Sequence, residues 1–288
     1  MKKKLFPLLI LSISYTWQLN AQNNSILLTK GEKWVVKSKD SNDTKQIRAG
    51  EEMPMKTYTT AMSEYQVLEA NPESYMLTHT IKKISVQFDG FGMKMEYDSE
   101  DPSKQSEMMK EQMKGLVGKV DTIYLTLDGK LIDTEEGTQS KKGKKGGAGG
   151  GRGMGNMMRM MEQGGSNPEN LFVSIPKGIK EGEGWKSDKT KDGVKSQTIY
   201  FVEKINGNSI ELSFKKKTKG VRSFTTQQGE SNIDIDNLSS GNIVVDATNG
   251  KVKNYTEKVD TKSKMNMMGM DMTTNGSTAS YLDVSSNQ

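Results

Sequence analysis

The sequence Gly31-Glu32-Lys33-Trp34 near the start of the chain returns in the second half as Gly182-Glu183-Gly184-Trp185. After each copy the same order of segments follows: a short strand pattern, a turn signal, a longer strand pattern, and finally a strand–turn–strand. The duplication predicts one β-rich unit that occurs twice. The matching turn signals are Asn71-Pro72 and Asn206-Gly207, and the matching strand–turn–strand segments are 125–131 and 244–252.

Apolar and polar residues alternate through most of these strand patterns, which is typical of antiparallel strands with one wet face. The segment 75–88 departs from this rule, because its apolar residues change parity around Lys82-Lys83. A β-bulge or a strong bend produces such a switch. We therefore predict an all-β, mainly antiparallel fold in two tandem repeated domains. Each would be a curved sheet, half-barrel or sandwich, with one short helix in the first.

Asn-Gly pairs predict hairpin turns, because glycine readily adopts the positive φ that a type I′ turn requires. They occur at Asn206-Gly207, Asn249-Gly250 and Asn275-Gly276. The third is expected to precede a last strand at 279–284.

The short helix is predicted between strands of the first half. Asp101 is a favourable N-cap and Pro102 fits the first helical turn. Met109, Met113 and Leu116 recur at helical spacing. We expect this methionine-bearing helix to lie across the curved sheet.

The ends and the middle of the chain have distinct compositions. A basic start, an apolar run from Leu5 to Tyr15 and the junction Leu19-Asn20-Ala21 are typical of a secretory signal peptide. Residues 137–167 are rich in Gly, Lys and Met, which predicts a disordered linker. The expected division is a signal peptide (1–21), β-rich domain 1 (22–136), the linker (137–167) and β-rich domain 2 (168–288).

The signal peptide predicts a periplasmic, extracellular or cell-surface location. The chain has no cysteine, so we expect neither a lipoprotein anchor nor disulfide bonds. No later segment approaches the ~20 apolar residues of a transmembrane helix. The mature chain is therefore expected to lack a transmembrane segment.

The formal net charge of +5 does not belong to the predicted domains. Three lysines lie in the signal peptide, and the linker carries six cations against Glu162, which leaves −3 for the two domains together. A protein that binds nucleic acid through its fold carries its positive charge on the fold. We therefore expect no nucleic-acid partner.

Catalytic machinery is hard to assemble from this sequence. It contains no cysteine that could act as a nucleophile. Its one histidine is His79, which we interpret as a half-buried strand residue and not as a catalytic base. Hydrolysis by a pair of carboxylates remains an alternative, because such pairs are defined by their distance in space and not by their spacing in the sequence. The glycine-rich motifs lack the spacing of a nucleotide site, and segment 232–237 fits a strand better than a calcium loop. We predict a protein that is not an enzyme and has no cofactor.

Methionine is the compositional feature with most chemical content, at 20 residues. Thioether sulfur suits Cu(I), although methionine also fills gaps and forms adaptable apolar surfaces. A Met-rich Cu(I)-binding periplasmic protein is therefore an alternative function. One methionine cluster lies at 154–161, and the candidate ligands in the other are Met265, Met267, Met268, Met270 and Met272.

The architecture supports a different first hypothesis. A curved antiparallel sheet with apolar residues on its concave side and a helix across it forms an apolar groove. Such grooves hold apolar or extended ligands, so the predicted partner is a lipid, a lipoprotein, a peptide or another secreted protein. A structural or envelope-assembly role without a small ligand is the remaining alternative.

Several motifs carry a resemblance. The body of the chain resembles an uncharacterised family of secreted β-rich proteins, and the Leu19-Asn20-Ala21-Gln22 junction resembles signal-peptide ends of gliding and gut-type Gram-negative bacteria. More distantly, bent strands with one inserted helix resemble the periplasmic half-barrels that carry lipoproteins. The family likeness implies a secreted β-rich fold and assigns no catalytic residue. It rests on Lys30-Gly31-Glu32-Lys33-Trp34, Tyr97-Asp98-Ser99, Leu125 to Leu131, Ile175-Pro176 and Gly182-Glu183-Gly184-Trp185.

Overall fold

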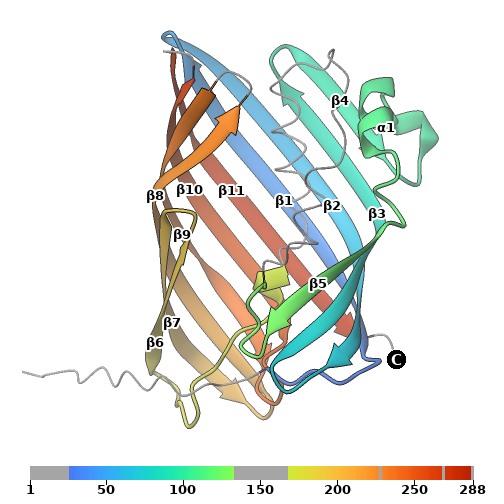
Figure 1. Cartoon of the computed structure of the whole chain (residues 1–288), viewed down its shortest axis with the longest axis vertical. Coiled ribbons are helices and arrows are strands. Elements are labelled where there is room, and N and C mark those ends of the chain that lie inside the picture. Colours follow the sequence, from blue (N-terminus) through green and yellow to red (C-terminus); the bar gives the residue numbers. More distant parts are fainter. Residues whose placement is uncertain (1–25, 133–167, 227–228, 268–269, 287–288) are drawn as a thin grey trace, which may run out of the picture.

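The computed structural model describes residues 26–132, 168–226, 229–267 and 270–286. The described strands form one eleven-stranded antiparallel sheet, accompanied by short helices (Figure 1). The strands are β1 Lys33–Arg48, β2 Glu51–Ala70, β3 Ser74–Gly90, β4 Met93–Asp98, β5 Val120–Thr126, β6 Gly184–Lys191, β7 Val194–Asn206, β8 Ser209–Thr226, β9 Gly229–Asp246, β10 Val252–Met267 and β11 Met270–Ser286; the helical segments are η1 Pro102–Lys104, α1 Glu107–Met113 and η3 Pro168–Leu171.

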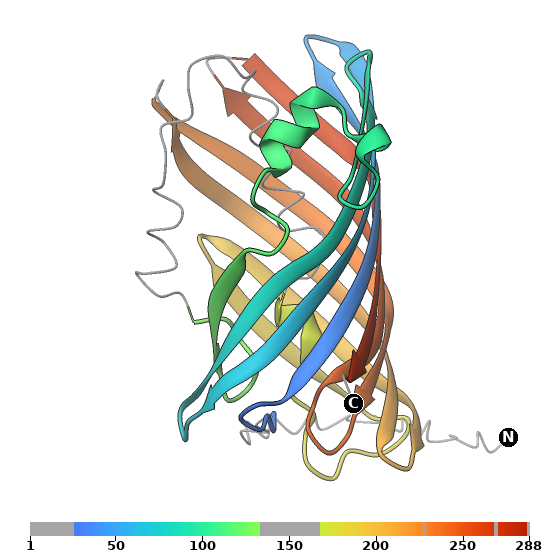
Figure 2. The same cartoon turned by 90° about the vertical axis from the view of Figure 1, so that its right-hand side faces the viewer.

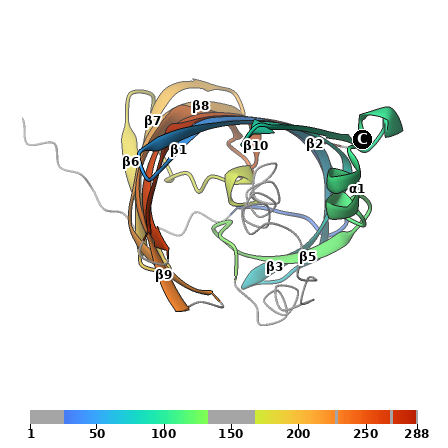
Figure 3. The same ribbon diagram turned by 90° about the horizontal axis from the view of Figure 1, so that it is seen from above.

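The strand order is β4-β3-β2-β1-β11-β10-β9-β8-β7-β6, and β5 also pairs with β3. The edges formed by β4 and β5 on one side and by β6 on the other do not pair with each other. The long strands run side by side at a common tilt (Figure 2). Seen from above, the sheet curls into an open trough with η3 inside its curve (Figure 3). We call the face that carries η3 the concave face.

The all-β class is confirmed, whereas the division into two domains is not. Strand β1 pairs with β11 from Trp34↔Ser286 to Arg48↔Met272, so the two halves of the chain share one sheet. Edge strands present unpaired N–H and C=O groups, and mutual pairing satisfies them. The predicted signal peptide and linker lie outside the described residues.

The two halves also share a hydrophobic core at the lower end of the trough in Figure 1. Trp34, Tyr65 and Leu77 from the first half pack in the same cluster as Val202 and Leu212 from the second. The segment 26–28 ties the halves together, because its amides donate to Leu127 O and Asn249 O. Five residues that fill this end come from outside the strands: Ile26, Leu28, Leu171, Phe172 and Val173.

The predicted bulge in β3 is confirmed. The pairing between β2 and β3 shifts between Met62↔Lys83 and Ser63↔Ile81, so Lys82 is the extra residue. Because of this shift, Leu77 before the bulge and Val86 after it are both buried. Without the bulge, strict alternation would place either Leu77 or Val86 on the outer face of the sheet.

The hairpin predictions have mixed outcomes. Gly207 and Gly250 lie in turns with φ values of 55° and 73°, as the Asn-Gly signal requires. The prediction for Asn275-Gly276 was wrong, because both residues lie inside β11 opposite β1 and β10. A Cβ at Gly276 would lie 2.4 Å from Asp43 O, so this glycine permits a close backbone approach and does not form a turn.

The helix prediction was right in place but wrong in extent. Asp101 caps only the 3-10 turn η1, and α1 begins after Ser106. The break lies at Gln105, whose φ of −112° and ψ of 92° are extended. Met109 and Met113 are buried against β3 and β4, as the helical spacing predicted. Among the described residues, no helix is long and apolar enough to cross a membrane.

Candidate functional site

Four aromatic side chains form a row across the concave face, which we call the aromatic row: Trp185, Tyr200, Phe214 and Tyr255. They come from β6, β7, β8 and β10, and successive ring centroids are 4.8, 6.3 and 5.7 Å apart. Strand β9 contributes Gly241 where the row crosses it. The missing side chain allows the Phe214 ring to reach Tyr255 over β9, because a Cβ at Gly241 would lie 2.8 Å from Phe214 Cε1.

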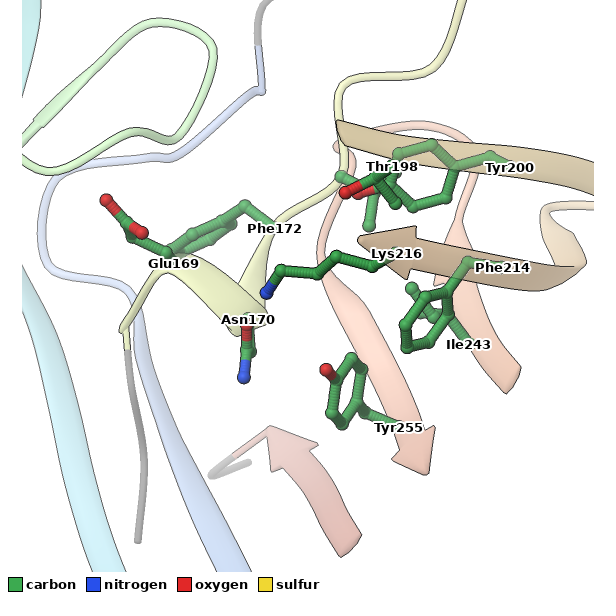
Figure 4. Close-up of a pocket in the computed structure, with 10 residues that line it drawn as sticks. Glu169, Asn170, Phe172, Thr198, Tyr200, Phe214, Lys216, Ile243 and Tyr255 are labelled. Carbon is green, nitrogen blue, oxygen red and sulfur yellow. The ribbon is translucent and has the colours of Figure 1, made fainter. Parts of the chain in front are cut away.

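Three members of the aromatic row, Tyr200, Phe214 and Tyr255, line a small cavity of about 50 Å³ (Figure 4). Phe172, which follows η3, lies over it and also packs edge-on against Trp34 at 6.1 Å. Lys216 extends toward Asn170 (Figure 4). Pockets for small molecules usually measure about 300–1,000 Å³. The cavity is therefore smaller than a usual ligand pocket, and Glu169, Asn170 and Phe172 form part of its lining.

Polar side chains continue the concave face beyond the aromatic row. Glu257 lies opposite Ser280, and Ser280 lies opposite Asp40, in one line across β10, β11 and β1. The Tyr255 hydroxyl donates to Glu257 Oε2 at 2.6 Å, so the polar line begins where the aromatic row ends. The concave face is thus apolar at its lower end, as expected, and polar along its middle, which the sequence did not predict.

Burial and charge shift the ionisation of these groups. Burial raises the pKa of Asp40 to about 6; a hydrogen bond from Ser280 opposes this rise, and the Glu257 carboxylate adds to it. Burial also raises the pKa of Tyr255, with a further contribution from Glu257. The pKa of Tyr200 is raised by burial as well. Both tyrosines therefore remain neutral hydrogen-bonding groups at physiological pH.

Buried oxygen atoms without hydrogen-bond partners line the concave face of β1. Within the described part of the chain, these are Ser38 Oγ, Asp40 Oδ2 and Thr44 Oγ1. All three residues have the same strand parity. A buried polar atom without a partner costs about 1–3 kcal/mol, so groups of this kind require an explanation such as water or a bound polar group.

The strand register pairs four of the five predicted methionine ligands across β10 and β11. Met265 and Met272 face each other across β10 and β11, and Gln46 Nε2 donates to Met272 Sδ at 3.5 Å. Met267 and Met270 are paired in the backbone register, while Met268 lies outside the described residues, as does the 154–161 cluster. In the described ranges, no group of three or more His, Cys, Asp or Glu residues could hold a metal ion.

His79 packs as a half-buried strand residue, as the sequence predicted. Its ring stacks on Tyr65 with a centroid distance of 4.7 Å, and burial lowers its pKa. In segment 232–237, Ile233 and Ile235 are half-buried while Asp234 and Asp236 are exposed, so the strand interpretation is confirmed there.

Sequence reasoning did not find the aromatic row or the polar line beside it. Tyr200 and Phe214 carried a strand signal, but nothing local to Asp40 indicates that it lies near Glu257. The two residues approach only because β1 and β10 both pair with β11. The one available signal was the presence of aromatic residues of the same parity in successive predicted strands.

Comparisons with known proteins place the fold and the family. A solved structure of lipovitellin, described by its lipid-protein interactions, aligns with a TM-score of 0.50 and 11% identity over 91% of this chain and 26% of that chain. The chain therefore spans about a quarter of that protein. At this identity the likeness shows the fold alone.

Two other solved structures match less well. Pseudomonas aeruginosa OpdQ aligns with a TM-score of 0.22 and 7% identity over 89% of this chain and 100% of that one. The COG4313 outer membrane channel of Pseudomonas putida F1 aligns with a TM-score of 0.22 and 6% identity over 92% and 99%.

No curated protein matches the chain. The profile of the Family of unknown function (DUF6263) matches residues 72–252, which is more than half of the sequence and extends from β3 into β10. The chain belongs to the Family of unknown function DUF6263.

Proposed function

We propose that this protein is a non-catalytic, extracytoplasmic binding protein whose concave face holds an apolar or extended ligand such as a lipid, a lipoprotein segment or a peptide. The observation that carries the proposal is the aromatic row with its adjoining polar line. Aromatic faces bind apolar groups, while their hydroxyls and the nearby carboxyls orient polar ones.

The unpaired oxygens of β1 support the same proposal. Ser38, Asp40 and Thr44 present buried acceptors along one strand of the open trough. An extended ligand that runs along β1 would satisfy them in series, because side chains of one face recur at every second residue. The lipovitellin likeness supports a sheet of this shape but does not identify a ligand.

The cavity is too small for such a ligand unless segment 168–172 moves. Phe172 separates the aromatic row from Trp34, and Glu169 forms an ion pair with Lys189 of β6. We propose that binding displaces this segment from the aromatic row. The Phe172→Ala variant would then bind more tightly than the wild type, because less packing is lost when the segment moves.

Site-specific photo-crosslinking in the envelope of the host tests the proposal. A benzophenone amino acid at Lys216 lies on the concave face beside the cavity, and the same probe at Glu211 lies on the opposite face of β8. We expect a lipid or peptide adduct at position 216 and none at 211. Equal labelling at both positions, or none at either, would refute a concave-face ligand.

Cu(I) handling is the second candidate, and the pairing of Met265 with Met272 is the observation that favours it. Cross-strand partners have Cβ atoms about 4.5–5.5 Å apart, close enough for two thioethers to share one ion. Replacing Met265, Met267, Met268, Met270 and Met272 together with leucine should abolish Cu(I) binding and leave the circular dichroism spectrum unchanged. Retained binding would exclude this cluster.

A further inference from the structure

The convex face of the second half carries a surface that the concave-face ligand does not use. Ile199, Phe201 and Leu238 point outward from β7 and β9 and are 42, 42 and 55% exposed. A shallow depression of about 310 Å³ is lined by Ile199 and Leu238 together with Lys215, Lys217 and Lys258. We call these six residues the convex patch.

The strand register places apolar and basic side chains alternately in the convex patch. Ile199 lies opposite Lys215 across β7 and β8, and Leu238 lies opposite Lys217 across β8 and β9. Lys258 of β10 follows after Ser240. From β7 to β10 the patch spans three strand spacings, roughly 14 Å.

Several other lysines of the convex face, unlike those of the convex patch, are paired with acids. Among the described residues, Lys215, Lys217 and Lys258 form no ion pair within 4.0 Å, although Asp260 also lines the depression. Neighbouring Lys186 and Lys219 pair with acids at 3.0 and 3.8 Å. In the first half, Lys45, Lys56 and Lys94 pair with Glu52, Asp43 and Asp89 at 3.0, 3.3 and 3.3 Å.

We propose that the convex patch docks on the surface of an anionic lipid bilayer. Unpaired lysines at an anionic surface contact lipid phosphates, while exposed apolar side chains enter the interfacial region. The long lysine side chains can extend past the apolar groups toward the headgroups. The positive charge is local, since the two predicted domains together carry −3, so the patch orients the protein on the membrane. This inference does not depend on the ligand of the concave face.

Vesicle co-sedimentation of the full chain tests the proposal. We expect binding to phosphatidylcholine vesicles that contain phosphatidylglycerol, little binding to phosphatidylcholine alone, and loss of binding at high salt. The K215Q/K217Q/K258Q variant should bind roughly 100-fold more weakly, because each lysine near an anionic surface contributes about a fivefold factor. I199S/L238S should also bind more weakly at low salt.

The K45Q/K56Q/K94Q variant is the matched control, because it removes the same charge from paired lysines of the same face. It should bind anionic vesicles like the wild type, and all variants should keep the wild-type melting temperature. If both triple variants lost vesicle binding equally, net charge alone would explain the binding and the proposal would be overturned. Binding to polyglutamate without binding to any vesicle would overturn it in favour of an acidic protein partner.

Discussion

At the scale of single residues, a few side chains of the concave face sustain unfavourable environments. Asp40 is a largely buried carboxyl beside Glu257, and one of its oxygens has no partner among the described residues. Gly241 has the opposite role, because its missing side chain creates room for the aromatic row. The role of each residue depends on a side chain from another strand, Glu257 for Asp40 and Phe214 for Gly241.

Asp40 should make stability depend on pH. Its pKa rises from 3.8 in the unfolded chain to about 6 in the folded state, so the folded protein binds the proton more tightly. The resulting stabilisation is present below about pH 4 and is lost as the pH rises through about 6. Relative to wild type, Asp40→Asn should therefore gain roughly 1–3 kcal/mol in unfolding free energy between about pH 4 and pH 8.

Urea denaturation across this pH range measures the effect. Asp43→Asn, on the outer face of the same strand, is the control, and its exposed pair with Lys56 should contribute less than about 1 kcal/mol at any pH. A difference between Asp40→Asn and wild type that does not change with pH would contradict the account.

Gly241→Ala should strongly destabilise the fold. The new Cβ would lie 1.8 Å from Thr256 O, a backbone atom, and 2.8 Å from the Phe214 ring. Overpacking of this kind costs about 1–3 kcal/mol or more, which thermal unfolding detects as a lower Tm. Ser240→Ala, at the adjacent exposed position, should remain within about 0.5 kcal/mol of wild type. Similar Tm values for the two variants would show that β9 relaxes at no cost.

At the scale of elements, the sequence predicted features that depend on neighbouring residues. The parity change in segment 75–88 predicted the β3 bulge, because alternation is a local property of a strand. Asn275-Gly276 misled for the same reason: its dipeptide signal is that of a turn, but two adjacent strands impose extended backbone on it. The predicted helix is divided at Gln105, which is extended and whose side-chain Nε2 donates to Asp98 O at 2.7 Å.

Helix α1 should stabilise the β3–β4 edge through its methionines. Met109 is fully buried against Val86 and Tyr97, whereas its neighbour Met108 is 49% exposed. Met109→Ala should lower the free energy of unfolding by about 2–5 kcal/mol, while Met108→Ala should change it by less than about 0.5 kcal/mol. Chemical denaturation compares the two, and equal effects would mean that α1 does not pack on the sheet as described.

At the scale of the whole molecule, the duplication predicted from the sequence is compatible with a single sheet. Gly31 and Gly182 each donate to the valine that ends the matching strand pattern, Val67 and Val202. The two predicted copies differ in their surroundings, because β1 pairs with β11 while β6 remains an edge strand. The sequence could not predict this pairing, since β1 and β11 lie near opposite ends of the chain.

The shared core predicts that neither half folds alone. Residues 22–136 and 168–288, produced separately, should each lack a cooperative thermal transition, whereas the full chain should unfold in a single one. The physical reason is that Trp34 and Tyr65 pack in one cluster with Val202 and Leu212, and each isolated half would expose its share of it. A cooperative transition in either half would support two independent domains instead.

Native mass spectrometry of the protein, purified gently from its own host, tests the central proposal most directly. The concave-face proposal predicts a bound mass that corresponds to a lipid or a peptide, and this mass should be lost in a Tyr200→Ala/Phe214→Ala variant that retains its fold. Whole-number additions of copper would favour the methionine site. A bare chain mass from every preparation would contradict a ligand-binding role.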